Sequence, residues 1–337
     1  MPKRRIFGNR QPNASSTNGS ETDEKNRDLG FGTSISAKNR RLINQDGSFN
    51  IRRVGQRIQD IHPFQFLVTI SWWEFALCVL IAYLLFNTVF AFLYLMAGVE
   101  QLSGGEDLIT WLDRFMYAFF FSVQTFTTVG YGTVSPVGLS VNIIAAFEAM
   151  TGLLGFAVAT GVLMGRFSQP SAKIGFSDQI LIAPYSHAEE GAINSLQFRI
   201  VNRRINQLID LEVMVVMRYY NKVNGKEKQD FRQLNLERDK VKLFPLTWTI
   251  VHPITQDSPL HGCTSEELAY KHTEFLITLK GYDETFAQHV HARMSYRYDE
   301  MIWGAKFVKV FHEMEEGPIE LQVDKVSLCE KAELNAY

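Results

Sequence analysis

Six residues between two long apolar stretches constrain this chain more than any other feature. Residues 127–132 read Thr-Thr-Val-Gly-Tyr-Gly, and the flanking stretches cover about 73–95 and 142–167. A helix needs about 20 apolar residues to cross roughly 30 Å of hydrocarbon, so each stretch is long enough to span a bilayer. A non-helical loop is tolerated at membrane depth only where protein buries it or where it lines a water-filled cavity. We therefore expect residues 127–132 to line a pore.

The string Thr-Val-Gly-Tyr-Gly of residues 128–132 is the known motif of K⁺ selectivity filters. Such a filter replaces the water around an ion with backbone carbonyl oxygens, which bring no counter-charge. Gly130 and Gly132 reach the unusual backbone angles of a carbonyl row without steric cost. We expect K⁺ at the carbonyl oxygens of Thr128, Val129, Gly130 and Tyr131. Because one chain holds one copy and a filter takes four loops, a homotetramer is predicted.

The segment before the filter, residues 111–126, is predicted to form a short pore helix. It is too short, and too polar at its end, to span the membrane. Asp113 lies near its start, where a carboxylate is favourable against the positive end of the helix dipole. Its C-terminal end runs into Thr127 at the pore and would aim partial negative charge at a waiting cation.

The distribution of Lys and Arg predicts how the chain crosses the membrane. About a dozen basic residues precede the first span, the loop between the spans holds Arg114, and Arg166 and Lys173 follow the second span. By the positive-inside rule, both termini are cytoplasmic. The chain is therefore expected to be an integral, multi-pass membrane protein.

Three segments are predicted before the first span. Residues 1–35 are rich in Asn, Ser, Gly and charge and are expected to form a disordered tail. Residues 36–59 are expected to be a cytoplasmic segment that contains an edge strand. Residues 60–71 have a strongly apolar side, which predicts either an interfacial slide helix or a simple continuation of the following helix.

Glu148 is the one ionisable side chain in the outer half of the second span. A carboxylate is costly to bury in a membrane, so Glu148 is a candidate functional residue. It either contacts ions directly or supports the back of the filter by hydrogen bonds toward Gln124 or Thr125. We favour the supporting role, with Gln124 as a second supporting residue.

The second span also holds the residues expected to line the inner pore. Phe156, Thr160 and Met164 recur at helical spacing on one face, and Met164 is predicted to form an apolar constriction that gates by dewetting. Glycines in this span either let helices pack closely or let the helix bend. We expect a bend at Gly152 and close packing at the other glycines.

The C-terminal half changes to the alternation of polar and apolar residues that is typical of half-buried strands. Short alternating segments separated by turn signals predict a β-sandwich over residues 171–315. Residues 316–337 are expected to be a C-terminal tail.

This half shows no pattern of an enzyme or a metal site. His252, His261 and Cys263 fit no standard zinc spacing, and Asp283-Glu284 is an isolated acidic pair. No Gly-rich nucleotide loop is present, and three scattered cysteines form no disulfide framework. The net charge of −2 gives no reason to expect a nucleic acid partner. We expect no catalysis and no cofactor, with K⁺ as the permeant ion.

Taken together, the segments resemble the inward-rectifier K⁺ channels, and most closely their prokaryotic branch. The resemblance covers about residues 36–312 and includes the blocks Ile182-Ala183-Pro184-Tyr185, Asp257-Ser258-Pro259-Leu260 and Ile302-Trp303-Gly304. It implies a membrane α-helical two-span pore domain, a cytoplasmic all-β immunoglobulin-like sandwich that extends the pore, and the inner membrane of a bacterium. It also implies a second, cytoplasmic constriction between Gly281 and His289, which includes Glu284 and Ala287.

Departures from the family pattern limit what this resemblance implies. Strongly rectifying members carry an acidic residue at the position of Phe156, so strong block by Mg²⁺ or polyamines in the cavity is not expected. Asp210 and Glu212 either attract cations in the cytoplasmic pore or form a solvated strand face. The basic cluster that binds phosphoinositides in eukaryotic members is reduced to Arg166 and Lys173. The attraction of each such basic residue to anionic lipid contributes about 1 kcal/mol of binding free energy.

We therefore predict a homotetrameric, passive, K⁺-selective channel. Its inner gate is expected to be biased by the cytoplasmic sandwich and by membrane lipid or another intracellular signal. Two alternatives stay open. One is a two-span channel of another family with a nucleotide-binding α/β domain, and the other is a membrane-anchored binding or sensor protein with a non-conducting pore.

Overall fold

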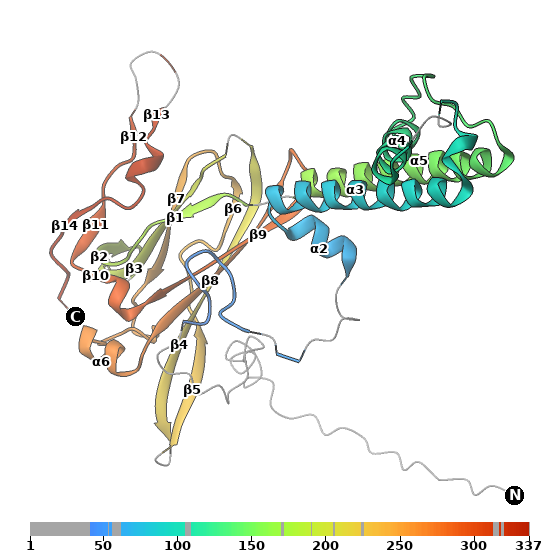
Figure 1. The fold of residues 1–337 in the computed structure, drawn as a ribbon. Helices are drawn as coiled ribbons and strands as arrows, with labels where there is room; N and C mark the ends of the chain where they lie inside the picture. Colours follow the sequence, from blue (N-terminus) through green and yellow to red (C-terminus); the bar gives the residue numbers. More distant parts are fainter. Residues whose placement is uncertain are drawn as a thin grey trace, which may run out of the picture. The chain divides into compact units, whose positions relative to one another are not determined.

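The computed structural model describes residues 41–52, 54–55, 62–104, 109–169, 172–189, 191–204, 206–223, 226–312, 317 and 320–336. Two compact units are present (Figure 1): Arg53–Gln169, here called the pore unit, and a unit formed by Met1–Arg52 with Pro170–Tyr337, here called the sandwich unit. The predicted tail of residues 1–35 lies outside the described residues.

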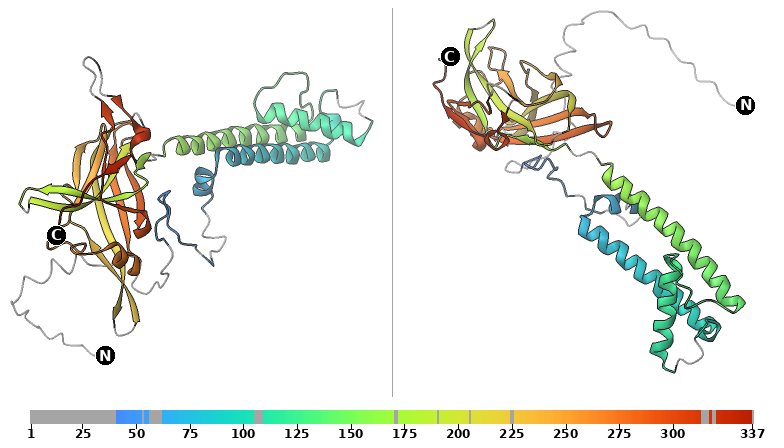
Figure 2. Two further views of the ribbon diagram at one scale, coloured as in Figure 1. Left: turned by 90° about the vertical axis from the view of Figure 1, so that its left-hand side faces the viewer. Right: turned by 90° about the horizontal axis from the view of Figure 1, so that it is seen from above.

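The pore unit contains two helices, α3 (Trp72–Ala97) and α5 (Leu139–Phe167), that are long and apolar enough to cross a membrane. Between them lie the 3₁₀ turn η2 (Val99–Gln101) and the short helix α4 (Trp111–Phe126). Figure 2 shows α3 and α5 running side by side. Their large apolar side chains are mostly exposed in the single chain, as expected for helices that face lipid or other copies.

Local capping fixes where these helices begin. The Ser71 hydroxyl accepts the backbone N–H of Glu74 at 3.2 Å, and the Glu74 carboxylate accepts the backbone N–H of Ser71 at 2.8 Å, which is a complete capping box. At α4, the Thr110 hydroxyl accepts the backbone N–H of Asp113 at 3.1 Å. Each cap satisfies N–H groups that the first turn of a helix leaves without a partner.

Helix α2 (Pro63–Thr69) is shorter than the predicted slide helix of residues 60–71. Its first helical residue is Pro63, whose missing N–H costs nothing at that position. Ile70 ends the helix in an extended conformation and Ser71 caps the next one, so α2 is not a continuation of α3. Residues 60 and 61 lie outside the described residues.

The sandwich unit has two five-stranded sheets. The first contains β1 (Ile174–Phe176), β2 (Ile180–His187), β3 (Gly191–Asn202), β7 (Thr247–Pro253) and β10 (Met301–Trp303), and β10 runs parallel to β2. The second contains β4 (Leu208–Val223), β5 (Lys226–Gln233), β6 (Lys240–Leu243), β8 (Glu274–Asp283) and β9 (Gln288–Arg297). Their inward-facing side chains form one large apolar core.

This architecture confirms the predicted fold class of two spans followed by an all-β sandwich. Within the described part of the sandwich unit, the α-helix is α6 (Ser265–Tyr270), and two 3₁₀ turns, η3 (Tyr298–Glu300) and η4 (Val323–Lys325), accompany it. A nucleotide-binding α/β domain needs helices on the faces of a parallel sheet. The two-span alternative with such a domain is therefore wrong.

The C-terminal segment belongs to the sandwich, which corrects the expectation of a tail over residues 316–337. Strand β14 (Cys329–Lys331) pairs with β11 (Ala305–Phe307), and β13 (Glu320–Leu321) pairs with β12 (Phe311–His312). Asn335 donates its backbone N–H to Asn194 Oδ1 at 2.9 Å and its side-chain Nδ2 to a β3 carbonyl at 2.6 Å. These strands are only two or three residues long, too short to produce a detectable alternation in the sequence.

The segment of residues 41–52 docks on the sandwich but does not extend a sheet there. Its isolated bridge joins Ile43 to Phe49 within the same segment, so the predicted edge strand is not seen among the described residues. Instead, the Leu42 N–H donates to the Glu274 carboxylate at 3.0 Å, and Ser295 donates to the Ile43 carbonyl at 2.6 Å.

The buried ion pair between Arg218 and Glu274 generates a prediction about stability. The two side chains are each 2% exposed, with Nη1 and Oε2 2.5 Å apart. Glu274→Ala removes the carboxylate that balances the buried Arg218 charge, and we expect a loss of about 3–5 kcal/mol in unfolding free energy. Thermal unfolding of the purified full chain measures this.

The matched control is Glu330→Ala. Glu330 pairs with Lys306 at 3.2 Å, and both side chains are more than half exposed. An exposed pair contributes at most about 1 kcal/mol. Equal destabilisation by the two substitutions would contradict the assigned importance of the buried pair.

Candidate functional site

The backbone of residues 127–132 alternates in handedness. Thr128, Gly130 and Gly132 have positive φ angles of 59°, 52° and 82°, while the intervening Val129 and Tyr131 do not. Alternation of this kind turns successive N–H groups to one side of the chain. The carbonyl groups consequently turn to the opposite side, which is the geometry required of a carbonyl row.

The N–H groups of residues 127–131 donate to the C-terminal part of α4. Thr128 donates to the Thr125 carbonyl at 3.0 Å, and Val129 and Gly130 both donate to the Gln124 carbonyl, at 3.0 and 3.2 Å. The Tyr131 N–H donates to the Gln124 side chain at 3.2 Å. Gln124 therefore braces the loop with its backbone and its side chain.

The carbonyl oxygens on the other side of the loop stay available. Among the hydrogen bonds of the described residues, none ends on a carbonyl of residues 128–131. A peptide oxygen that the protein itself leaves unpaired is a free acceptor for an ion or water. The arrangement therefore offers four successive oxygens to one path.

The positive φ of the filter residue Thr128 was not predicted from the sequence. Positive φ is costly for a β-branched residue, on the order of 1–3 kcal/mol, and persists only where the surroundings enforce it. The enforcement here comes from the hydrogen bond of its N–H to Thr125 and from the fixed position of the preceding Thr127, whose hydroxyl donates to the Val123 carbonyl at 2.7 Å.

Glu148 lies in a fully buried polar cluster that joins α3, α4 and α5. Its carboxyl group is hydrogen-bonded to the Tyr94 hydroxyl at 2.6 Å and to the Ser122 hydroxyl. The partners differ from the predicted Gln124 and Thr125, because Gln124 is already engaged with the filter. Glu148 thus reaches the pore helix two residues before the filter brace.

Gly152 is a close-packing position in this structure, in place of the predicted bend. A Cβ atom at Gly152 would lie 2.1 Å from the carbonyl oxygen of Phe126, the last residue of α4. Helix α5 runs without interruption from Leu139 to Phe167. The missing side chain therefore lets α5 touch the end of the pore helix.

Phe156, Thr160 and Met164 lie on a part of α5 that none of the described elements covers. Phe156 is 73% exposed and Met164 65% exposed, and Thr160 is also exposed. The structure therefore brings the three predicted pore-lining side chains to one open face. In a single chain, an open face is equally suited to lipid or to an aqueous pore.

Arg166 was predicted to bind lipid, but its side chain is instead hydrogen-bonded within the pore unit. Its guanidinium donates to the carbonyls of Leu67, Val68 and Ile70 at the end of α2, the last two at 3.2 and 2.8 Å. The same group lies 4.5 Å from the Trp72 ring centroid. Arg166 is only 9% exposed and clamps α2 to the end of α5.

The other predicted lipid residue, Lys173, is exposed. Its backbone carbonyl accepts the Arg203 N–H at 3.0 Å, next to the start of β1. The Lys173 side chain is therefore accessible at the surface, whereas the guanidinium of Arg166 is buried.

Asp210 and Glu212, the predicted cation-attracting residues, are each paired with a lysine on β6. Asp210 lies 2.6 Å from Lys242 and Glu212 lies 2.9 Å from Lys240. The Lys240 ammonium also holds the pKa of Glu212 below its usual range. The local charge is therefore balanced, which weakens the predicted attraction.

Gly281 accommodates an irregularity in the neighbouring strand. The register between β4 and β8 shifts between Ile209 and Glu212, and Asp210 there has a φ of +48°. A Cβ atom at Gly281 would lie 3.0 Å from the Leu211 side chain. Gly281 thus lies in strand β8, outside the adjoining turn.

Only residues 284–287 of the predicted Gly281–His289 constriction form a turn, between β8 and β9. Ala287 adopts a φ of +49°, and the Glu284 N–H donates to the Gln207 carbonyl at 3.3 Å. The fully buried Asp283 accepts the N–H of Thr285 at 2.9 Å. Asp283 therefore fixes the hairpin and does not pair with Glu284 as an acid–base couple.

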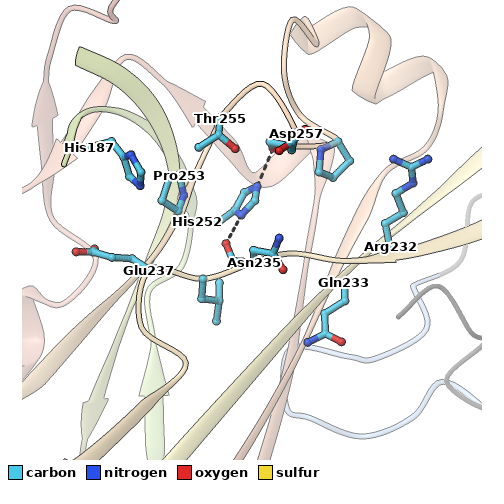
Figure 3. A pocket seen from close by; sticks show the side chains of 12 residues that line it. His187, Arg232, Gln233, Asn235, Glu237, His252, Pro253, Thr255 and Asp257 are labelled. Atoms are coloured by element: carbon cyan, nitrogen blue, oxygen red, sulfur yellow. Dashed lines mark hydrogen bonds between the residues drawn. The ribbon is translucent and has the colours of Figure 1, made fainter. Parts of the chain in front are cut away.

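The loose His/Cys cluster is structural. His252 Nδ1 donates to the Asn235 carbonyl at 2.6 Å, so Nε2 accepts from the Ser258 hydroxyl at 2.8 Å, and burial lowers the pKa of the imidazole. Figure 3 shows His252 at a pocket of about 560 Å³ whose lining includes neither His261 nor Cys263. No metal-binding group of His, Cys, Asp and Glu occurs among the described residues.

The contact between Gly152 and Phe126 gives a prediction with a matched control. Gly152→Ala forces α5 away from the end of α4 and should lower both thermal stability and K⁺ flux from liposomes. Gly161→Ala on the same helix meets nothing within 4 Å, so it should preserve both. If the two variants behave alike, the contact does not set the position of the pore helix.

The chain matches two described protein families. Residues 78–169 match the family described as "Ion channel", and residues 174–336 match "Inward rectifier potassium channel C-terminal domain". The second match reaches residue 336, in agreement with the packing of β14 and Asn335 on the sandwich.

Three curated proteins are similar over most of the matched region. "Inward rectifier potassium channel Kirbac3.1" of Paramagnetospirillum magnetotacticum is 39% identical over 86% of this chain and 95% of its own length. "ATP-sensitive inward rectifier potassium channel 12" of Gallus gallus is 27% identical over 71% of this chain and 58% of its own. "Inward rectifier potassium channel 4" of Mus musculus is 28% identical over 64% of this chain and 49% of its own.

The similarity includes both units of the chain, and of these three proteins the bacterial one has the highest identity. It agrees with the filter motif, with the two spans and with the all-β sandwich, and it places the chain in a family that is not enzymatic. The chain belongs to the inward rectifier potassium channel family, on its prokaryotic side.

Proposed function

We propose that this protein is a homotetrameric channel that conducts K⁺ passively and selectively. The observation that carries the proposal is the loop of residues 128–131, whose N–H groups donate to α4 and whose carbonyls accept no hydrogen bond among the described residues. The carbonyl oxygens of Thr128, Val129, Gly130 and Tyr131 hold the ion, and no cofactor takes part. Each chain supplies one quarter of every ion site.

The open surface beside the loop supports assembly into a tetramer. In the single chain Val129 is 53% and Tyr131 79% exposed, although both are large apolar or aromatic side chains. A hollow of about 370 Å³ next to them is lined largely by aromatic and apolar residues of α4 and the filter. Neighbouring copies cover this surface and hold the four loops around one axis.

The inner gate is formed by Phe156, Thr160 and Met164. In a tetramer the open face of α5 turns to the axis, where Met164 makes an apolar ring that excludes water when it narrows. The cytoplasmic sandwich biases this gate, and Gly281, Glu284 and Ala287 lie at or beside the turn proposed as the cytoplasmic constriction. The channel lies in the inner membrane of a bacterium, and both of its termini are in the cytoplasm.

Weak rectification follows from the charges along the proposed pore. Phe156 supplies no carboxylate to hold a blocking Mg²⁺ or polyamine in the cavity. Asp210 and Glu212 are neutralised by Lys242 and Lys240. Block by these cations is therefore weaker than in members that keep acidic residues at both levels.

The first prediction concerns the filter. Gly130 has a φ of +52° and open space around it within the chain, so Gly130→Ala acts through backbone strain, which we expect to cost about 1 kcal/mol or more. K⁺ selectivity or conduction should be lost, measured as Ba²⁺-sensitive Rb⁺ uptake into liposomes. Gly262→Ala, at a similar positive φ of 68° in the sandwich unit, should retain the uptake.

The same uptake assay separates the channel from the alternative of a membrane-anchored sensor with a non-conducting pore. Absence of flux in every lipid composition favours the sensor. A chain that stays monomeric in mild detergent, or that admits Na⁺ as readily as K⁺, contradicts the proposed function.

The second prediction separates a clamp from a lipid site at Arg166. A guanidinium donates to several carbonyls through a planar fork and stacks on aromatic rings, whereas an ammonium keeps the charge and three donors but lacks the fork and the stacking. We therefore expect Arg166→Lys to disturb Rb⁺ flux and thermal stability as much as Arg166→Gln. If Arg166→Lys keeps the wild-type flux and Arg166→Gln does not, the positive charge at this position interacts with anionic lipid.

Lys173→Gln is the matched control for lipid attraction. The Lys173 side chain is exposed, so this substitution should change the response of flux to the fraction of anionic lipid without changing thermal stability. The sign of the lipid response is read from the same titration.

A further inference from the structure

If Glu148 is ionised, the buried cluster around it has more oxygen–oxygen contacts than it has protons to place between them. Asn87, Tyr94, Ser122 and Glu148 are each fully buried. In the hydrogen bonds and ion pairs of the described residues, the partners of Glu148 are Tyr94 and Ser122, and no Lys, Arg or His is among them. A carboxylate in this place has no counter-charge inside the span.

The orientation of Asn87 is fixed by its neighbour. Its side-chain Nδ2 donates at 2.7 Å to the carbonyl of Tyr83, which accepts only. The Asn87 Oδ1 atom consequently faces the Ser122 hydroxyl, 3.1 Å away. Ser122 therefore has an acceptor on one side.

Ser122 also has the Glu148 carboxyl group on its other side. A hydroxyl carries a single proton. If Glu148 is ionised, Ser122 can serve only one of its two neighbours, and the other contact sets two lone pairs against each other. Burying such an unsatisfied contact is unfavourable.

A proton on Glu148 satisfies every contact in the cluster. The acid donates to the Ser122 oxygen, and Ser122 donates to Asn87. Asn87 in turn donates to the backbone, and the Tyr94 hydroxyl donates to the second carboxyl oxygen at 2.6 Å. In this arrangement each proton makes one hydrogen bond, and each of the close oxygen–oxygen contacts has a proton between its two atoms.

We propose that Glu148 is a proton-binding site, and that the neutral acid is the form that supports the filter. Its carboxyl group is hydrogen-bonded to Ser122 on α4, two residues before Gln124, which braces the filter N–H groups. Removing the proton at alkaline pH places a charge behind the filter, and K⁺ flux falls. This regulatory step rests on the proposed channel function, whereas the proton site itself does not.

The titratable surroundings of Glu148 are simple. Among the described residues, α3 contributes Tyr94 as a titratable neighbour and α4 contributes only the Ser122 hydroxyl. The arginines of the pore unit that the structure describes are engaged elsewhere: Arg114 pairs with Glu100 at 2.9 Å, and Arg166 clamps α2.

Infrared difference spectroscopy of the full-length protein in liposomes tests the proton site. We expect the carbonyl band of a protonated carboxyl group at neutral pH, and its loss in Glu148→Gln. Glu100→Gln, which alters an exposed, Arg-paired carboxylate, should leave the band in place. If the spectra of wild type and Glu148→Gln are identical in this region at neutral pH, the proposal is overturned.

A second variant keeps the test decisive if Glu148→Gln fails to fold. Ser122→Ala removes the acceptor of the carboxyl proton, so the same band should shift to higher frequency. An unshifted band, or none, contradicts the assigned hydrogen bond.

Flux then tests the regulatory step. The ratio of Rb⁺ uptake at alkaline pH to that at neutral pH should fall in the wild type and stay constant in Glu148→Gln. An equal fall in both overturns the regulation. If neither conducts at any pH, the channel function fails, while the infrared band still decides the proton site.

Discussion

The pore unit depends on how the N–H groups of one loop are satisfied. Carbonyls can be reserved for an ion only if the N–H groups of the same peptides find partners on the other side of the chain. The last turn of α4 provides these partners, chiefly through the backbone and side chain of Gln124. The position of α4 therefore fixes the filter. Gly152 against Phe126, and the Glu148 cluster through Ser122, fix α4 in turn.

Features set by local sequence were predictable, and features set by partners were not. Apolar length identified the spans, and the filter string identified the loop, because both are contiguous in the chain. Gln124 and Glu148 were predicted to support the filter, but the contacts of Glu148 with Tyr94 and Ser122 bring together residues of three different helices. Thr128 was predicted as a filter residue, but its positive φ was not, because hydrogen bonds impose it against the preference of a β-branched residue.

Charged residues illustrate the same limit. Arg166, Asp210 and Glu212 were singled out by sign and position alone. The structure assigns Arg166 to backbone carbonyls and the two acids to lysines on β6. A charged residue can be recognised in a sequence, but whether its charge is paired within the protein or attracts an ion or lipid depends on the partner that the fold brings to it.

The closure of the sandwich by β14 and Asn335 has a consequence for biosynthesis. Both contacts are made with β11 and β3, which are completed earlier in the chain. While residues 329–335 are still inside the ribosomal tunnel, α3 and α5 have already emerged and can enter the bilayer. The final strand pairing is therefore a late event, and until it occurs the sandwich unit of the nascent chain carries an open sheet edge.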